Sequence, residues 1–476
     1  MKLQLMSIAR LGSALVVVAV LAACSKDGGL APSAQPVAPS DAALAFDKGT
    51  PTATYLVKFK TGGITAARAS VASLGATVGR EIGSYNLLYV TGLSDAAAAS
   101  LATQPGMTVV RDRLVQWVPN PSTVAPTFLQ ATNAPKASGT NQSGAQFFST
   151  YQWGLKVTRA DQTWTPSNGG GGETVCVLDT GIDPGHNDLV GAVDLSRSFS
   201  AILVPRFASD LVLDDYHFHG SFTAAQIRSN GIGTASVAPN STLCAIKVLS
   251  EDGGGTFGDI IFGIFVAGKL GADVINMSLG GYIQATDPAN APLLTILQEI
   301  IDGTRNNGTV IVAASGNGGF NMADLFALIG FIHVPSMMNN VLSVGATGPY
   351  QQQNFDQVTG YSNYGTGGGV DVVAPGGNGG LPGGVLADFQ LSVCSRFAFG
   401  GACAAGNFYL FGNGTSFASP MVAGAAAVVE SNVGSMTSAA VEKCLLTTAS
   451  YINGGTLSKY GKGRLDVRAA SKCSGK

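Results

Sequence analysis

Five short apolar runs in the second half of the chain constrain its fold most strongly. They are residues 173–179 (ETVCVLD), 242–249 (TLCAIKVL), 272–279 (ADVINMSL), 308–316 (GTVIVAASG) and 340–347 (NVLSVGAT). Strands that are buried on both faces of a parallel sheet have this near-continuous hydrophobic pattern. Helical patterns at 259–270 and 293–306 lie between the runs. The alternation predicts an α/β fold with a mostly parallel sheet and helices on both of its faces.

Polar residues at the ends of these runs are candidates for a site, because active sites in such sheets gather at the carboxyl ends of the strands. Asp179 ends the first run, and Asn317 follows the fourth. Ser416 directly precedes a helical pattern that extends to about residue 430. A serine at a helix N-terminus faces free N–H groups and the positive end of the helix dipole, which suits an oxyanion.

A serine nucleophile needs a base, and the chain has only four histidines. His219 is followed by Gly220 and by a segment that can begin a helix, so it is the best-placed base. His217 would point the opposite way in an extended chain. His186 lies in the loop after Asp179, and His333 lies in an apolar region before a proline. We therefore expect a catalytic triad of Asp179, His219 and Ser416.

These segments together resemble the subtilisin-like serine peptidases, the subtilases of peptidase family S8. The matching motifs are VLDTGID at 177–183, HG at 219–220, ASGN at 314–317 and GTSFASP at 414–420. Their order in the chain, Asp then His then Ser, is the subtilisin order. The resemblance implies a serine endopeptidase with the three-layer subtilisin-like α/β fold.

The resemblance also assigns roles around the triad. Asn317 and the N–H of Ser416 would hold the oxyanion. Backbone along two cleft strands would pair with an extended peptide substrate. The implied substrate-binding residues are Gly253, Gly254, Gly255, Ser278, Leu279, Gly280, Ala314, Ser315, Gly316 and Thr415.

The chain departs from the family pattern at several positions. After His219-Gly220 it continues Ser221-Phe222, without the usual second histidine, and Phe417 stands where methionine is usual. The segment 318–335 is longer and more apolar than expected, and it places His333 near the floor of the primary specificity pocket.

The predicted reaction needs no cofactor, although relatives of this kind bind structural calcium. Asp188 is the candidate calcium ligand in this chain. One carboxylate is weak support for an ion that takes six or more oxygens.

The first 23 residues resemble a lipoprotein signal peptide. Lys2 and Arg10 give the segment a positively charged start, and residues 11–20 then form an apolar stretch that is too short to cross a membrane. The stretch ends in LAAC at 21–24, so the resemblance implies a lipid on Cys24. The alternative is an ordinary signal peptide followed by a chance cysteine.

Composition divides the rest of the chain. Residues 24–52 are rich in Ala, Pro, Ser and Gly and predict a flexible tether. Residues 53–118 alternate strand and helix patterns, and they resemble the inhibitory propeptide of these enzymes, a small α+β domain of ferredoxin-like type. Residues 119–150 predict a linker with the maturation cleavage, and residues 151–476 the catalytic domain.

This organisation predicts where the protein acts and on what. The precursor would be tethered to the cell envelope by its lipid, and self-cleavage would release an extracellular enzyme. Its partners would be protein or peptide substrates and its own propeptide, as an intramolecular inhibitor, and we expect a monomer. The formal net charge of −2 gives no electrostatic basis for binding nucleic acid.

Six cysteines remain after Cys24, an even number that suits disulfides in an oxidising compartment. The natural local pairs are Cys394 with Cys403 and Cys444 with Cys473. Cys176 and Cys244 both lie in apolar runs, so they are either partners on neighbouring strands or buried thiols.

Two other functions are consistent with parts of the sequence. An inactive relative could use the same fold to bind peptides, but such a protein should have lost triad or oxyanion residues. A lipase-type hydrolase would need GxSxG and the order Ser, Asp, His. The sequence favours an active peptidase.

Overall fold

The computed structural model describes residues 49–132, 142–164, 168–434 and 436–474. The predicted signal peptide, Cys24 and most of the tether lie outside these ranges. Among the described residues, no helix is both long and apolar enough to cross a membrane.

A seven-stranded parallel sheet forms the centre of the fold, with the strand order β15-β14-β12-β10-β6-β8-β7. Its strands are β6 (Thr174–Asp179), β7 (Phe199–Ser200), β8 (Thr242–Lys247), β10 (Val274–Met277), β12 (Val310–Ala314), β14 (Leu342–Thr347) and β15 (Val372–Pro375). The five apolar runs of the sequence are β6, β8, β10, β12 and β14, which confirms the prediction of a mostly parallel sheet.

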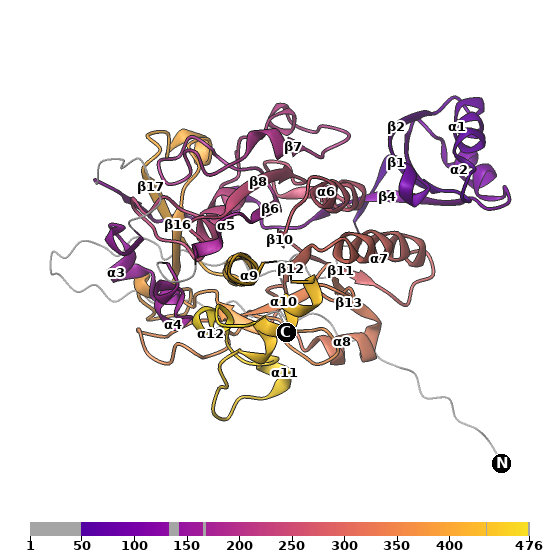
Figure 1. Cartoon of the computed structure of the whole chain (residues 1–476). Helices are drawn as coiled ribbons and strands as arrows, with labels where there is room; N and C mark the ends of the chain where they lie inside the picture. The colour runs from indigo at the N-terminus through magenta and orange to yellow at the C-terminus, as the bar shows by residue number, and fades with distance from the viewer. Residues whose placement is uncertain (1–48, 133–141, 165–167, 435, 475–476) are drawn as a thin grey trace, which may run out of the picture. The chain divides into compact units, whose positions relative to one another are not determined.

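Alternate residues of each strand face different helix layers. Val175 and Val177 of β6 belong to a core shared with α5 (His219–Ile227), α9 (Thr415–Val433) and α10 (Ser438–Thr447). Cys176 and Leu178 belong to a second core, shared with α6 (Phe257–Lys269) and α7 (Ala291–Asn306). The period-two alternation of a strand thus supplies both cores, and the fold has the three predicted layers (Figure 1).

A smaller α/β unit, here called the N-terminal unit, comprises residues 50–118. Its elements are β1 (Thr50–Lys58), α1 (Ile64–Ser73), β2 (Thr77–Ile82), β3 (Leu87–Thr91), α2 (Asp95–Ala102) and β4 (Thr108–Gln116). The strands pair antiparallel in the order β2-β3-β1-β4. The sequence pattern did not predict β2, because Gly79 and charged residues interrupt it and its burial is low for an edge strand.

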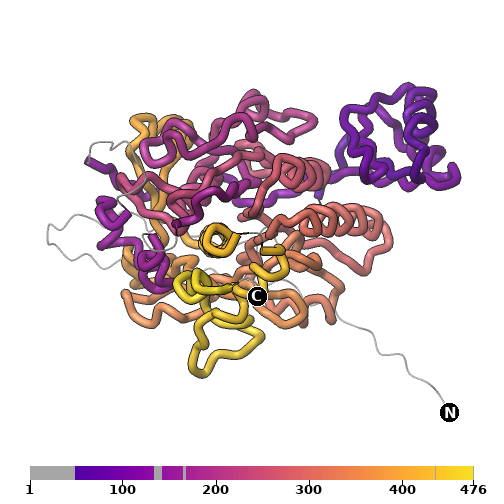
Figure 2. The backbone as a smooth tube through the Cα atoms, viewed as in Figure 1, coloured from indigo at the N-terminus to yellow at the C-terminus, as the bar shows by residue number. Residues whose placement is uncertain are grey.

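The N-terminal unit has two apolar faces with different partners. Tyr55, Val57 and Leu88 pack with α1 and α2 in a core of the unit's own. Leu56 and Tyr89 point the other way and join the core that contains α6 and α7. Figure 2 follows the chain from this indigo unit into the larger remainder, here called the large unit.

Polar contacts border this apolar junction. Lys58 pairs with Glu299 of α7, and Arg80 lies 3.4 Å from Asp259 of α6. The Tyr85 ring packs edge-on against Phe265, with ring centroids 5.9 Å apart.

Shorter elements complete the large unit. They are α3 (Phe148–Tyr151), α4 (Trp153–Val157), β5 (Phe128–Gln130), β9 (Gly254–Thr256), β11 (Gly281–Gln284), α8 (Met322–Ile329), β13 (Phe331–Val334), β16 (Gln390–Val393), β17 (Phe408–Gly412), α11 (Leu457–Tyr460) and α12 (Val467–Ala470). β5 belongs to the predicted linker, yet it pairs with β17 at the edge of a three-stranded sheet.

Three disulfides join the cysteine pairs that were considered from the sequence. They are Cys394–Cys403, Cys444–Cys473 and Cys176–Cys244. The last bond links β6 to β8, where the two cysteines are direct partners in the parallel ladder. The neighbouring-strand alternative for Cys176 and Cys244 is therefore the correct one.

Candidate active site

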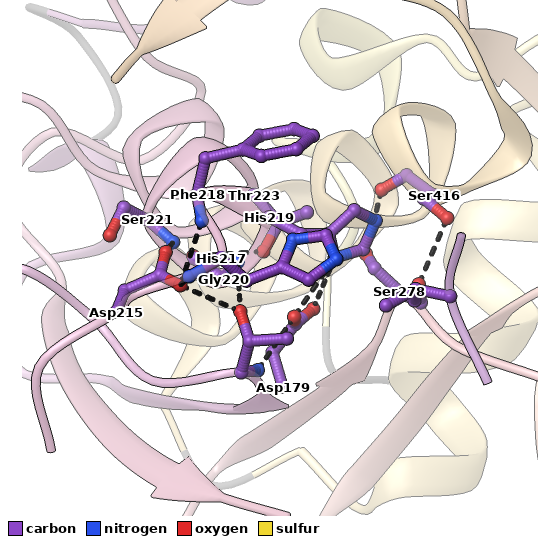
Figure 3. Close-up of polar contacts among 12 residues, drawn as sticks. Asp179, Asp215, His217, Phe218, His219, Gly220, Ser221, Thr223, Ser278 and Ser416 are labelled. Carbon is purple, nitrogen blue, oxygen red and sulfur yellow. Dashed lines mark hydrogen bonds and ion pairs between the residues drawn. The ribbon is translucent and has the colours of Figure 1, made fainter. Parts of the chain in front are cut away.

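Asp179, His219 and Ser416 converge at the carboxyl end of the large sheet (Figure 3). Asp179 is the last residue of β6, His219 begins α5 and Ser416 lies in the first turn of α9. The Nδ1 atom of His219 lies 2.9 and 3.0 Å from the two carboxylate oxygens of Asp179. This bond fixes the orientation of the imidazole and leaves its Nε2 atom for proton transfer.

A buried carboxylate that the sequence analysis missed organises the start of α5. Asp215 accepts the N–H groups of Phe218 at 2.9 Å and Ser221 at 2.8 Å. It also accepts the Thr180 hydroxyl at 2.8 Å, next to Asp179. Burial raises the pKa of Asp215. The only signal in the sequence was an acidic residue shortly before a predicted helix start, which is a common capping pattern.

The backbone directly before His219 is strained. Phe218 has φ 107°, a region that non-glycine residues seldom adopt. Such a residue costs on the order of 1–3 kcal/mol and persists only where its surroundings hold it. Asp215 holds its N–H, and its ring stacks on Phe399 with centroids 5.2 Å apart. The result is a fixed entry of the chain into the helix that carries His219.

The Ser416 hydroxyl donates to the carbonyl of Ser278 at 2.9 Å rather than to His219. The Ser278 hydroxyl in turn donates to the carbonyl of Ser416 at 2.7 Å. Hydrogen bonds between nucleophile and base are often formed only when substrate is bound. Ser416 and His219 line the same cavity, where a bound substrate would meet both side chains.

Asn317 is oriented by the residue before the serine. Its Oδ1 atom accepts both the N–H and the hydroxyl of Thr415, each at 2.8 Å. Because these donors fix the amide oxygen, the amide N–H₂ is directed away from Thr415. Asn317, His219 and Ser416 line one cavity, so the amide donor and the N–H of Ser416 can both face a developing oxyanion there.

The backbone of the predicted cleft is occupied by the chain itself. β4 pairs antiparallel with β9, with Val115 opposite Gly255 and Gln116 opposite Gly254. Trp117 then donates its N–H to Gly253, and its carbonyl accepts from Gly280. These contacts place residues 114–118 as an extra strand between two of the predicted cleft segments.

His217 contacts the residue that follows this strand. Its Nε2 donates to the carbonyl of Pro119 at 2.8 Å, across almost a hundred residues of sequence. Burial, with the nearby charge of His219, lowers the pKa of His217 to about 3. The ring is therefore neutral and holds the chain beside His219 as a hydrogen-bond donor.

The remaining two histidines have separate environments. His186 is buried, accepts the N–H of Asp188 at Nδ1 and approaches the carbonyl of Phe408 at 3.0 Å through Nε2. His333 is buried in β13 beside Gly280 and Gly316. This position is next to the predicted substrate-binding residues.

Asp188 does not fit the predicted calcium ligand. Its carboxylate accepts the N–H groups of Ile232, Gly233 and Thr234 at 2.7–3.0 Å and the Tyr409 hydroxyl at 2.8 Å. These donors already stabilise the buried carboxylate, and most of them converge on its Oδ2 atom. Asp188 is instead a buried anchor for the loop that it binds.

A different acidic group lies at the amino ends of β6 and β10, the ends opposite to the triad. Carboxylate oxygens of Glu173, Asp273 and Glu430 lie within 4.8 Å of one another. Burial and mutual repulsion raise the pKa of Glu430 to about 9 and that of Glu173 to about 7. The three carboxylates could contribute to a cation site, and protonation of Glu430 and Glu173 would oppose binding there.

Comparison with known proteins identifies the family. The model of the subtilase family of peptidases matches residues 170–463. The thermophilic serine proteinase of Bacillus sp. (strain AK1) is 33% identical over 317 residues, which is 66% of each chain. Subtilisin DY of Bacillus licheniformis is 32% identical over 326 residues, 68% of this chain and 99% of that protein.

Solved structures agree at the level of the fold. A serine protease from Staphylococcus aureus that processes the epidermin leader peptide (EpiP) superposes with a TM-score of 0.68. It is 20% identical, and the match covers 89% of this chain and 98% of that one. The chain described here belongs to the subtilase family, and it is a serine-type endopeptidase with the subtilisin-like α/β fold.

Proposed function

We propose that this endopeptidase cleaves peptide bonds in proteins through an acyl-enzyme formed on Ser416. His219 takes the proton of the hydroxyl as the serine attacks, and Asp179 stabilises the resulting imidazolium. The Asn317 amide and the Ser416 N–H hold the oxyanion. His219 then protonates the leaving amine, and water completes the hydrolysis by the reverse sequence of proton transfers.

One observation carries this proposal. The buried two-oxygen contact from Asp179 orients the imidazole of His219, and His219 lines the same cavity as Ser416 and Asn317. A turn-capping aspartate and a loop histidine would have no reason to meet in this way beside a serine at a helix N-terminus.

We also assign residues 53–118 as the inhibitory propeptide. Its last strand follows the cleft backbone at Gly253 and Gly280, where a substrate would pair. Its tail reaches Pro119, which lines the cavity of His219 and Ser416. A strand in that position excludes substrate by competition for the same hydrogen bonds.

The cellular part of the proposal rests on the sequence of the N-terminus. A lipid on Cys24 would hold the precursor at the cell envelope. Cleavage within 119–150 would leave the lipid with the propeptide and release a monomeric extracellular enzyme. Membrane fractionation tests this part: the mature catalytic domain should appear in the soluble fraction while the propeptide stays with the lipid.

The central experiment is intact-mass analysis of the wild type and of Ser416→Ala, both produced without the signal segment. We expect the wild type to lose its residues up to a position within 119–150 and the variant to remain full length. A wild type that stays full length and hydrolyses no peptide would favour the alternative of a peptide-binding relative. A Ser416→Ala protein with wild-type activity would refute the triad.

A further inference from the structure

The side chain of His333 lies between two segments of the proposed cleft. A methyl group built on Gly280 would overlap its Cε1 atom, and one built on Gly316 would lie 2.6 Å from its Nε2 atom. Real Cβ atoms do not come so close to a neighbour. The imidazole therefore packs directly on the backbone of both glycines and fills the gap between them.

This gap is next to the reacting serine. The segment that contains Gly280 also contains Ser278, whose carbonyl accepts the Ser416 hydroxyl. The segment that contains Gly316 leads directly into Asn317. A peptide that pairs with Gly280, as Trp117 does, continues toward Ser416. The side chain just before the attacked bond must then enter the space between the two segments.

Neighbouring residues hold the imidazole in this place. The Ser336 hydroxyl lies 2.8 Å from its Nδ1 atom, and the Tyr282 ring packs edge-on with centroids 5.0 Å apart. The Tyr282 hydroxyl accepts from Asn363 at 2.7 Å, and Asn363 also donates to the carbonyl of Ser315 at 2.8 Å. The ring is thus supported from behind by a chain of contacts that ends in the cleft wall itself.

The electrostatics distinguish two roles for a histidine at this position. A protonated ring would attract an acidic substrate side chain, whereas a neutral ring acts through its volume. Burial lowers the pKa of His333 to about 3, so the ring is neutral at the pH values where a histidine base operates. A steric role is therefore favoured over recognition of acids.

We infer that His333 closes the floor of the primary pocket, so that the enzyme cleaves after small uncharged residues and disfavours aromatic and acidic ones. The inference rests on the proposed function, because it requires Ser416 to be the nucleophile. It accounts for the glycine at Gly280, where the three atoms nearest to an added Cβ all belong to His333, and it is compatible with Gly316. A side chain at either position would exclude the imidazole.

The test compares tetrapeptide p-nitroanilides that differ only in the last residue: Gly, Ala, Leu, Phe or Glu. We expect the self-processed wild type to have a kcat/KM for Ala at least about 10-fold above that for Phe. In His333→Gly, the ratio of kcat/KM for Phe to kcat/KM for Ala should rise by about 10- to 100-fold. Ser336→Ala is the matched control, which frees the ring without removing its volume and should cause a smaller rise.

Labelling of Ser416 by a fluorophosphonate separates this inference from the proposed function. A wild type that is labelled yet cleaves after Phe or Glu as well as after Ala would overturn the inference alone. A wild type that is neither labelled nor active would overturn the proposed function and the inference with it. The wild-type profile decides the matter even if His333→Gly does not fold.

Discussion

The two sheets of this protein bury their faces by different means. The large sheet covers both faces with helices of its own unit, and three disulfides reinforce that unit. The N-terminal sheet covers one face with α1 and α2, but its other face, with Leu56 and Tyr89, is covered by helices of the large unit. The large sheet thus needs no helix from the other unit, whereas the N-terminal sheet has one face covered only by helices of the large unit.

This difference is consistent with the proposed maturation, in which the N-terminal unit is removed and the large unit remains. An apolar face that is buried only at a junction stabilises the junction while the chain is intact. Once the connection is cut, departure of the N-terminal unit would expose the same face to water. The free-energy cost of this exposure is about 25 cal/mol per Å² of apolar surface. Four predictions test how far the chemistry and the junction are independent of each other.

The largest effect is expected from Asp179→Asn, which should alter the chemistry alone. The amide keeps the shape of the carboxylate but favours the wrong tautomer of His219, so kcat should fall by about 10⁴-fold. Steady-state kinetics on a small peptide measure the loss. Hydrogen exchange of the β4 amides should be unchanged, and faster exchange would show that the site and the junction are coupled.

The second effect concerns the oxyanion donor. Asn317→Ala removes the amide and should lower kcat by about 100- to 1000-fold with little change in KM. Thr415→Val is the matched control, because it removes only one of the two donors that orient Asn317. Its loss should be smaller, and equal losses in the two variants would contradict a direct role for the amide.

The third effect is a pH dependence of the junction. Asp112 of β4 is buried and accepts the N–H of Gly258, close to Asp259. Burial and the charge of Asp259 raise the pKa of Asp112 to about 7, and burial raises that of Asp259 to about 6, although Arg80 opposes this. A raised pKa means that the docked form favours the proton. Docking is therefore strongest in acid and weakens as the pH rises through 7.

Asp112→Asn should remove this dependence while keeping the bond to Gly258. Both proteins carry Ser416→Ala, so that neither cleaves itself, and hydrogen exchange of β4 measures the equilibrium constant for opening of the junction. The ratio of this constant in the protein with Asp112 to that in Asp112→Asn should rise by on the order of 10- to 100-fold between pH 5 and 8. His217 has a lowered pKa, so its contribution makes docking stronger as the pH rises. Because His217 is present in both proteins, its contribution cancels in the ratio. A constant ratio would rule out Asp112 as the titrating group.

The smallest effect should separate the stabilities of the two units. Gly303 lies inside α7, where alanine would favour the helix by about 0.5–1 kcal/mol. A methyl group there would overlap the Tyr85 hydroxyl. Gly303→Ala should therefore raise the thermal stability of the large unit yet open the junction about 3- to 10-fold more often, because Tyr85 can turn aside at modest cost.

Adding Tyr85→Phe to Gly303→Ala removes the atom with the closest overlap and should restore part of the docking. The coupling between the two changes, measured as a double-mutant cycle of β4 hydrogen exchange, should be favourable. Additive effects would mean that Tyr85 and Gly303 do not meet.

The sequence predicted the parts of this molecule that follow from local patterns. Apolar runs with a polar last residue identified β6 and Asp179, and the helix start after Gly414 located Ser416. Contacts between distant residues left no such pattern. Asp215 looks like an ordinary loop aspartate until α5 is placed, and the bond from His217 to Pro119 joins residues that only the fold brings together.

The same limit applies to the calcium prediction. Asp188 was a candidate ligand because it is a carboxylate in a loop region. The sequence could not show that three backbone N–H groups converge on it. His333 could be placed near a pocket from its neighbours in the chain. Its packing on Gly280 and Gly316 required the antiparallel pairing of β11 with β13, which brings residues 281–284 against residues 331–334.

The bond between Cys176 and Cys244 makes this part of the fold dependent on the redox state of its surroundings. It joins the strand that ends in Asp179 to its neighbour, and such bonds persist only where the surroundings are oxidising. A chain retained in a reducing cytoplasm would lack this brace directly behind its triad. The disulfide between β6 and β8 is thus expected to form only after the chain reaches an oxidising compartment.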